Sequence, residues 1–126
     1  MKRDADVVPT VATIVDERAA SVAAACLFRG MGDPSRVAIL RHLLLGEHNV
    51  AELTAHLELA QSTVSKHLAC LRDCGLVDSR PVGRSSVFAL TQPSAVTKVF
   101  AAAEELLSAT GDAVVLCPTS GVEMTR

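Results

Sequence analysis

Apolar residues recur every three to four positions in five stretches of this chain, a spacing that places them on one face of a helix. Polar residues, glycines and prolines lie between the stretches, where helices begin and end. The pattern predicts helices over residues 10–29, from Pro34 to Gly46, over 49–57, from Gln61 to Gly75 and over 95–109.

Two of these helix starts carry specific capping signals. Asp33 precedes Pro34, which places a carboxylate at the N-cap and a proline at the first helical position. Asn49 is followed three residues later by Glu52, the spacing of a capping box. Both signals support the helix boundaries that the apolar pattern indicates.

The helical pattern is interrupted between residues 76 and 90 by two strand-like segments. These segments, 76–80 and 85–90, flank a turn at 81–84 and predict a β-hairpin. The fold is then mainly α with a small β-hairpin, in the order α-α-α-α-β-β-α of a winged helix-turn-helix. We expect residues 1–9 to be a flexible N-terminus, 10–110 one winged helix-turn-helix domain, and 111–126 a C-terminal tail.

Length and composition limit the class of protein. The chain has 126 residues, of which 49% are hydrophobic and 21% charged, a balance typical of a folded protein. No apolar run reaches the roughly 18 residues that a membrane span needs, and the first residues do not resemble a signal peptide. We therefore expect a cytoplasmic protein with no membrane partner and with its four cysteines reduced.

Charge is distributed unevenly along the chain. The formal net charge of −2 argues against general affinity for polyanions. Residues 61–90 nevertheless have a net charge of +2, because they contain four basic and two acidic side chains. The basic ones are Lys66, Arg72, Arg80 and Arg84, and the acidic ones are Asp73 and Asp78. An anionic partner is therefore expected to meet the middle of the chain.

The helix that begins at Gln61 combines an apolar stripe with a polar face. Val64, Leu68 and Leu71 lie at i, i+4 and i+7 and are expected to pack on the core. The polar face carries groups that can bond to base edges and phosphates in a major groove. The predicted DNA contacts are Gln61, Ser62, Thr63, Ser65, Lys66 and His67 on this helix, with Arg80 and Arg84 of the hairpin.

Four segments together resemble the ArsR/SmtB family of small winged-helix repressors. They are DPSRVAIL at 33–40, AEL at 51–53, QSTVSKHL at 61–68 and LRDCGLV at 71–77. The resemblance covers roughly residues 20–108. It implies an operator-binding homodimer whose first and last helices form the subunit interface, with two recognition helices about one turn of DNA apart.

Cys70 and Cys74 lie at i, i+4 on the predicted recognition helix, so their sulfurs share one face. Two neighbouring thiolates form a soft chelate, whereas helical spacing fits a disulfide poorly. A closed site needs a third ligand, for which Cys117 in the tail is favoured over Cys26, whose alanine-rich surroundings indicate packing. His67 is the candidate for a fourth ligand, although a DNA or packing role suits it better.

The segment from Cys70 to Leu76 is similar to the motif of the CmtR-type cadmium and lead sensors within this family. There a tail cysteine of the partner subunit completes the site. The resemblance implies that Cys70, Cys74 and Cys117 bind Cd(II) or Pb(II), with Zn(II) as a further candidate, and that metal releases the repressor from its operator. Whether Cys117 comes from the same or the opposite subunit stays open.

Two alternatives share this fold. Cys70 and Cys74 could be oxidised by a redox signal, and three thiolates also suit arsenite. An enzyme is not expected, because the sequence has no glycine-rich phosphate loop, no nucleophile elbow and no Cys–His pair with an orienting acid.

Overall fold

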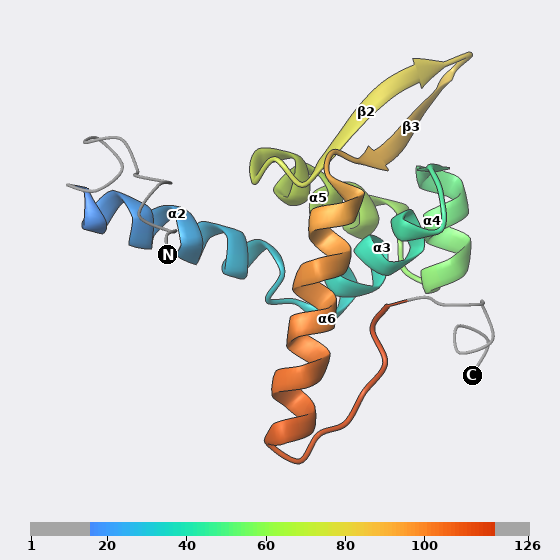
Figure 1. Ribbon diagram of the computed structural model, residues 1–126. Helices are drawn as coiled ribbons and strands as arrows, with labels where there is room; N and C mark the ends of the chain where they lie inside the picture. Colours follow the sequence, from blue (N-terminus) through green and yellow to red (C-terminus); the bar gives the residue numbers. More distant parts are fainter. Residues whose placement is uncertain (1–15, 118–126) are drawn as a thin grey trace.

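A computed structural model describes residues 16–117. Its elements are α2 (Glu17–Gly30), α3 (Pro34–Leu44), β1 (His48–Asn49), α4 (Val50–Leu57), α5 (Gln61–Asp73), β2 (Val77–Val82), β3 (Ser85–Leu90) and α6 (Pro93–Ala109). Figure 1 shows α3, α4, α5 and the strands gathered in one body, from which α2 and α6 project in different directions. The predicted winged helix-turn-helix is confirmed.

The helices begin where the capping signals indicate. The Asp33 carboxylate accepts backbone N–H bonds from Ser35 and Arg36, at 2.8 and 3.3 Å, and Pro34 opens α3. Asn49 and Glu52 form a reciprocal capping box at the start of α4, with both bonds at 2.8 Å. These bonds satisfy N–H groups that have no partner within the helix.

The first and last helices differ from prediction at their ends. The described part of α2 begins at Glu17, so residues 10–15 of the predicted helix and the expected N-terminus 1–9 lie outside the described residues. Gly30, expected to break this helix, is its buried last residue. The last helix begins at Pro93, two residues before the predicted start, because proline fits the first helical position.

A three-stranded antiparallel sheet in the order β1-β3-β2 replaces the predicted hairpin. The hairpin strands are present, with Ser79 paired to Phe88 and Gly83 at the tip in a left-handed conformation (φ 63°). The additional strand β1 pairs His48 with Phe88. Two residues are too few to produce an alternating pattern, so the sequence does not reveal this strand.

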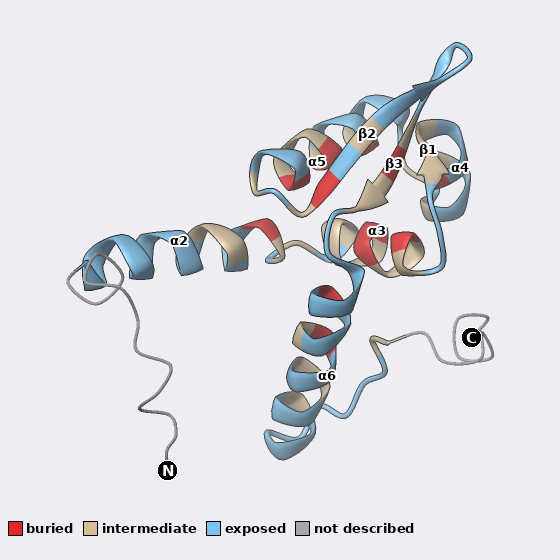
Figure 2. Cartoon of the chain, turned by 45° about the horizontal axis from the view of Figure 1, so that its top comes forward, coloured by how far each residue is buried: buried red, intermediate tan, exposed pale blue. Residues whose placement is uncertain are grey.

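The core lies where α3, α4, α5 and the start of α6 meet the sheet. Its buried members are Ile39, Leu40, Leu43, Leu53, Val64, Leu68, Leu71, Val77, Phe88, Val96 and Phe100. In contrast, α2 and the far part of α6 are mostly exposed (Figure 2), and 63% of Phe28 and 66% of Leu106 are accessible. Within residues 16–117, no helix is both long and apolar enough to cross a bilayer.

The segment that follows α6 folds back toward the body of the molecule (Figure 1). Arg41 on α3 donates from Nε to the carbonyl of Leu116 at 3.1 Å, and Leu116 and Cys117 pack against the core. Residues 118–126 of the expected tail lie outside the described residues. The part of the tail that carries Cys117 is therefore held by specific contacts.

Candidate DNA interface and thiol cluster

The two faces of α5 are separated as the sequence predicts. Val64, Leu68 and Leu71 are buried. The polar face carries exposed residues at Gln61, Ser62, Ser65 and Lys66, with Thr63 half-buried. The turn before α5 contains Glu58 in a left-handed conformation (φ 56°), which ends α4. The first turns of α5 are thus presented to solvent.

The hairpin brings one of its two predicted arginines to the start of α5. Arg84 at the tip and Gln61 line the same hollow, together with Asn49 at the start of α4 and Ser86 of β3. Arg80, also exposed, instead forms an ion pair with Glu47, just before β1. Arg84 is therefore free to meet a phosphate beside α5, whereas Arg80 must first leave its partner.

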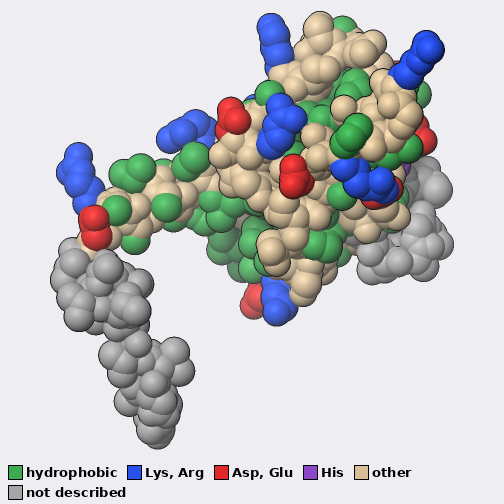
Figure 3. Space-filling view, turned by 90° about the horizontal axis from the view of Figure 1, so that it is seen from above, with side chains coloured by type: hydrophobic (Ala, Val, Ile, Leu, Met, Phe, Trp, Pro, Cys, Tyr) green, Lys and Arg blue, Asp and Glu red, His purple; other side chains and the backbone are tan. Residues whose placement is uncertain are grey.

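Basic side chains do not form one continuous block on this surface. Seen from above, Lys and Arg side chains stand at separate points, with acidic side chains between them (Figure 3). Such a surface has a weak overall field and offers an anionic partner only isolated positive charges. It agrees with the small positive charge of residues 61–90.

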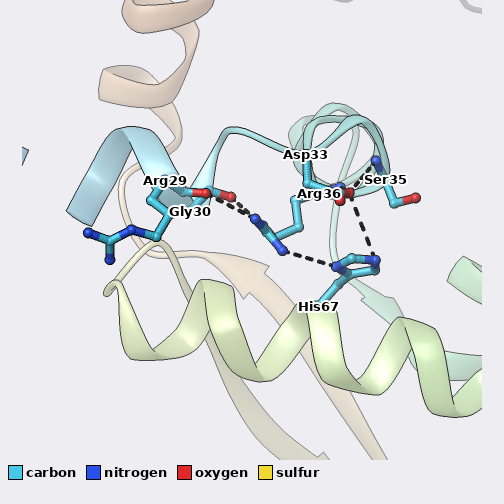
Figure 4. A network of polar contacts seen from close by, with 6 residues as sticks. All are labelled: Arg29, Gly30, Asp33, Ser35, Arg36 and His67. Carbon is cyan, nitrogen blue, oxygen red and sulfur yellow. Dashed lines mark hydrogen bonds and ion pairs between the residues drawn. The ribbon is translucent and has the colours of Figure 1, made fainter. Parts of the chain in front are cut away.

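His67 faces the interior of the molecule, toward the start of α3. Its Nδ1 accepts a hydrogen bond from Arg36 Nη1 at 3.3 Å, and its Nε2 lies 3.9 Å from the Asp33 carboxylate (Figure 4). Only 17% of the His67 side chain is accessible. The His67 ring is held by residues at the start of α3. It therefore helps to position α5 and does not point toward solvent, where a DNA contact would lie.

Arg36 is a positioning residue that sequence reasoning missed. Its Nε donates to the carbonyl of Gly30 at 2.6 Å and its Nη2 to that of Arg29 at 3.0 Å (Figure 4). These carbonyls end α2 and have no partner within the helix. Together with the bond to His67, the guanidinium joins α2, α3 and α5. The nearby Asp–Pro signal identified the helix start but not this bridge.

The predicted thiol pair is half-buried and has an additional neighbour. Cys70 and Cys74 are both partly accessible, and Cys74 Sγ lies 3.9 Å from Cys26 Sγ on α2. Burial raises the pKa of Cys74, and the thiols of Cys26 and Cys70 raise it further. Cys26, interpreted from the sequence as a packing residue, is therefore part of the thiol cluster formed by Cys26, Cys70 and Cys74.

Cys117 lies elsewhere in the chain. Its backbone N–H donates to Glu104 Oε2 at 2.7 Å, and its thiol points to the carbonyl of Thr97 on α6 at 3.6 Å. Burial and the neighbouring Glu104 carboxylate raise the pKa of the Cys117 thiol. Among residues 16–117, no three His, Cys, Asp or Glu side chains are already arranged to hold a metal ion. Within one chain, the described residues therefore do not place Cys117 beside Cys70 and Cys74.

A histidine cluster is a second feature that the sequence did not reveal. The rings of His42 on α3 and His56 on α4 are stacked, with centroids 4.9 Å apart, and His48 of β1 lies 5.6 Å from His56. Burial lowers the pKa of His42, and the charges of His56, His48 and Arg41 lower it further. Only the packing of α3, β1 and α4 brings these residues together.

Comparisons with known proteins agree with this architecture. The model of the family described as "Bacterial regulatory protein, arsR family" matches residues 33–79. The biofilm growth-associated repressor of Agrobacterium fabrum is 32% identical over 99 residues, covering 74% of this chain and 83% of that protein. The fold and these matches are those of the winged-helix class of transcription regulators. Within that class, the chain belongs to the arsR family.

Two further relatives are similar over a shorter region. CmtR of Mycobacterium tuberculosis is 48% identical over 68 residues, which cover 54% of this chain and 58% of that protein. A probable mercury resistance operon repressor of Streptomyces lividans is 39% identical over 66 residues, covering 52% of this chain and 53% of that protein. The chain thus spans little more than half the length of these two relatives.

Solved structures reproduce the fold over a larger share of their length. Reduced HlyU of Vibrio cholerae superposes with a TM-score of 0.62 at 34% identity, covering 70% of this chain and 95% of that one. The cadmium metal-sensor CmtR of Mycobacterium tuberculosis gives a TM-score of 0.51 at 42% identity, covering 60% and 81%. These likenesses support the fold and the family.

Proposed function

We propose that this chain is a metal-responsive transcriptional repressor, which binds operator DNA as a homodimer in the cytoplasm and leaves it when thiolates bind a soft ion. The observation that carries the proposal is the position of the thiol pair. Cys70 and Cys74 are half-buried at the C-terminal end of α5, whose first turns present the predicted DNA contacts. A ligand held by this pair acts directly on the DNA-reading helix.

The DNA contacts divide according to exposure. Gln61, Ser62 and Ser65 are exposed on the first turns of α5 and suit base edges in the major groove. Lys66 and Arg84 suit phosphates on either side of that groove. The remaining predicted contacts, Thr63, His67 and Arg80, are half-buried or ion-paired, and we assign them supporting roles.

Exposed apolar side chains on α2 and α6 support the proposed homodimer. Phe28 of α2 lines a common apolar hollow with Val99, Ala103 and Leu106 of α6. An exposed apolar surface of this kind is typical of a protein interface. A second copy that covers both helices would bury side chains that the single chain leaves in water.

The proposed dimer also suggests where the third thiolate comes from. Cys74 contacts α2, and Cys117 is held beside α6 of its own chain. If α2 of one copy packs against α6 of the other, the tail of that other copy passes near Cys74. We therefore assign the third ligand to Cys117 of the partner subunit.

Three thiolates suit Cd(II) or Pb(II), and Zn(II) is a further candidate. Thiols must lose their protons to bind these ions, and the pKa values of Cys74 and Cys117 are both raised. The apparent metal affinity should therefore rise steadily with pH through neutrality. A Cd(II) titration at several pH values, followed by thiolate-to-metal absorption, measures this dependence.

The decisive experiment is a DNA titration with and without Cd(II). The probe is a duplex selected from a random pool by the apo protein. Cd(II) should weaken binding by about 5- to 150-fold, the usual range of coupling between two ligands, and DNA should weaken Cd(II) binding by the same factor. Unchanged DNA affinity in protein that has bound Cd(II) would contradict the proposal.

Substitutions at two cysteines separate the metal response from DNA binding. Cys74→Ser should keep DNA binding and lose the response to Cd(II). Cys26→Ser is the matched control, because it removes a thiol from the same cluster but leaves the three proposed ligands, and it should respond as the wild type does. Stronger release by arsenite than by Cd(II) would instead favour an arsenic sensor.

A further inference from the structure

Cys26 has no role in the proposed metal site, yet it contacts one of the ligands. The Sγ atoms of Cys26 and Cys74 are 3.9 Å apart, although the residues are separated by 48 positions in the sequence. The Cys74 thiol also lies 3.6 Å from the backbone carbonyl of Cys26. This contact joins α2 to the end of α5.

Gly30 leaves the space that the Cys74 sulfur occupies. It follows Cys26 by four residues and so lies on the same face of α2. A Cβ atom at position 30 would come within 2.8 Å of Cys74 Sγ, which is closer than packed atoms approach. Both cysteines are only half-buried. The pair is thus held together and still accessible to a small solute.

We propose that Cys26 and Cys74 are an oxidation site, which a peroxide closes to an intrachain disulfide. One thiolate attacks a peroxide oxygen, takes up that oxygen as a sulfenic acid and, with a proton, releases water. The other thiol then attacks the sulfenic sulfur, so that the S–S bond forms and a second water leaves. Two thiols lose two electrons in total, and one hydrogen peroxide is reduced to two waters.

The geometry favours this pair over Cys70 and Cys74. Closure from 3.9 Å to a bond of about 2.05 Å is within reach of rotation about the side-chain χ1 angles. Cys70 and Cys74 instead lie on successive turns of one backbone, joined by a Cys74 N–H bond to the Cys70 carbonyl at 3.1 Å. Their Cβ atoms point in similar directions, which hinders a disulfide.

Oxidation would also change the metal response, a consequence that rests on the proposed function. A disulfide to Cys26 removes the Cys74 thiolate from the set of three ligands. The oxidised repressor should then keep its DNA regardless of Cd(II) until a reducing thiol reopens the bond. Oxidation and metal binding thus compete for one sulfur.

Tryptic mapping can identify the disulfide, because cleavage places each cysteine in a different peptide. The peptides are 19–29 with Cys26, 67–72 with Cys70, 73–84 with Cys74 and 99–126 with Cys117. The full-length protein is treated with hydrogen peroxide, remaining thiols are alkylated under denaturing conditions, and the digest is analysed by mass spectrometry before and after reduction. A non-reducing gel shows whether the bond lies within one chain.

The expected main product links peptides 19–29 and 73–84 in a species of monomer size. Cys70→Ser and Cys117→Ser should keep this product, whereas Cys26→Ser should lose it. A main bond between Cys70 and Cys74, a bond to Cys117, a bond between chains or the absence of any disulfide would overturn the proposal.

A Cd(II) titration of the reduced and oxidised protein distinguishes the two proposals. Oxidation should abolish the three-thiolate absorption, and reduction should restore it. If the disulfide maps as expected but the reduced protein does not respond to Cd(II), the proposed function fails and the oxidation site stands. If Cd(II) releases DNA but no Cys26–Cys74 bond forms, the oxidation site alone fails.

Discussion

The Arg36 side chain on α3 links this helix to α2 and to α5. Its guanidinium donates hydrogen bonds to the last carbonyls of α2 and to His67 of α5. The Arg36 backbone N–H donates to the Asp33 carboxylate, which caps α3. Burial raises the pKa of Asp33, but the hydrogen bonds from Arg36 and Ser35 outweigh it and hold that pKa below its usual value. The orientation of α5, the proposed recognition helix, thus depends on residues outside its proposed DNA-facing surface.

Arg36→Ala should lower the free energy of unfolding by about 1–3 kcal/mol, because it removes charged hydrogen bonds to partly buried acceptors. Urea unfolding measures this loss. Arg29→Ala is the matched control, since Arg29 is exposed and takes part in the network through its carbonyl, and it should change stability by less than about 0.5 kcal/mol. Equal losses in both variants would contradict the bridging role.

The histidine cluster makes stability depend on pH. Because the pKa of His42 is lowered from its usual 6.5, the unfolded chain binds a proton at a higher pH than the folded chain. The free energy of unfolding should therefore fall as pH drops below about 6.5 and should level off below the folded pKa. Urea unfolding between pH 7.5 and 5 tests this, and His42→Gln should flatten the dependence.

Among the secondary-structure elements, α5 has two opposite faces that differ in burial and polarity. One face buries Val64, Leu68 and Leu71, and the other presents short polar side chains. Its start has no side-chain cap, since Ala60 occupies the N-cap position, and packing therefore holds the helix. Substitutions on the two faces should have distinct consequences.

Leu68→Ala should destabilise the fold by about 2–5 kcal/mol, because it opens a cavity at a side chain that is 1% exposed. Ser65→Ala on the outer face should change stability by less than about 0.5 kcal/mol and weaken DNA binding. Unfolding curves and DNA titrations of both variants separate the effects. A stability loss in Ser65→Ala similar to that in Leu68→Ala would show that the faces are wrongly assigned.

At the scale of the whole molecule, the single chain leaves two projecting helices partly uncovered. Figure 2 shows that α2 and the far part of α6 have mostly exposed surfaces, in contrast to the body of the fold. Their exposed large apolar residues include Val22, Phe28 and Leu106. This distribution fits a protomer whose core is completed by a second copy.

Leu106→Glu should shift the proposed dimer toward monomer, because it places a charge in the apolar hollow between α2 and α6. Sedimentation equilibrium measures the change, and circular dichroism shows whether the fold is kept. Val82→Glu is the control, since Val82 is an exposed apolar residue of the wing, far from these helices, and should leave the oligomeric state unchanged. A dimer that survives Leu106→Glu would place the interface elsewhere.

The local structure of this protein follows from its amino-acid sequence. The capping residues Asp33 and Asn49, the apolar stripe of α5 and the turn at Gly83 each act through neighbours a few positions away, so their pattern is visible in one dimension. The same holds for Cys70 and Cys74, because one helical turn brings them to a common face. These features were enough to indicate the family and the proposed recognition helix.

Contacts between residues far apart in the chain depend instead on how the elements pack together. The contacts of Cys26 with Cys74, of Arg36 with His67 and of Glu104 with Cys117 join separate elements. The strand β1 and the histidine cluster depend on packing in the same way. Such contacts depend on how helices cross and pack. The spacing of residues along the chain does not specify these crossing angles and so does not predict the contacts.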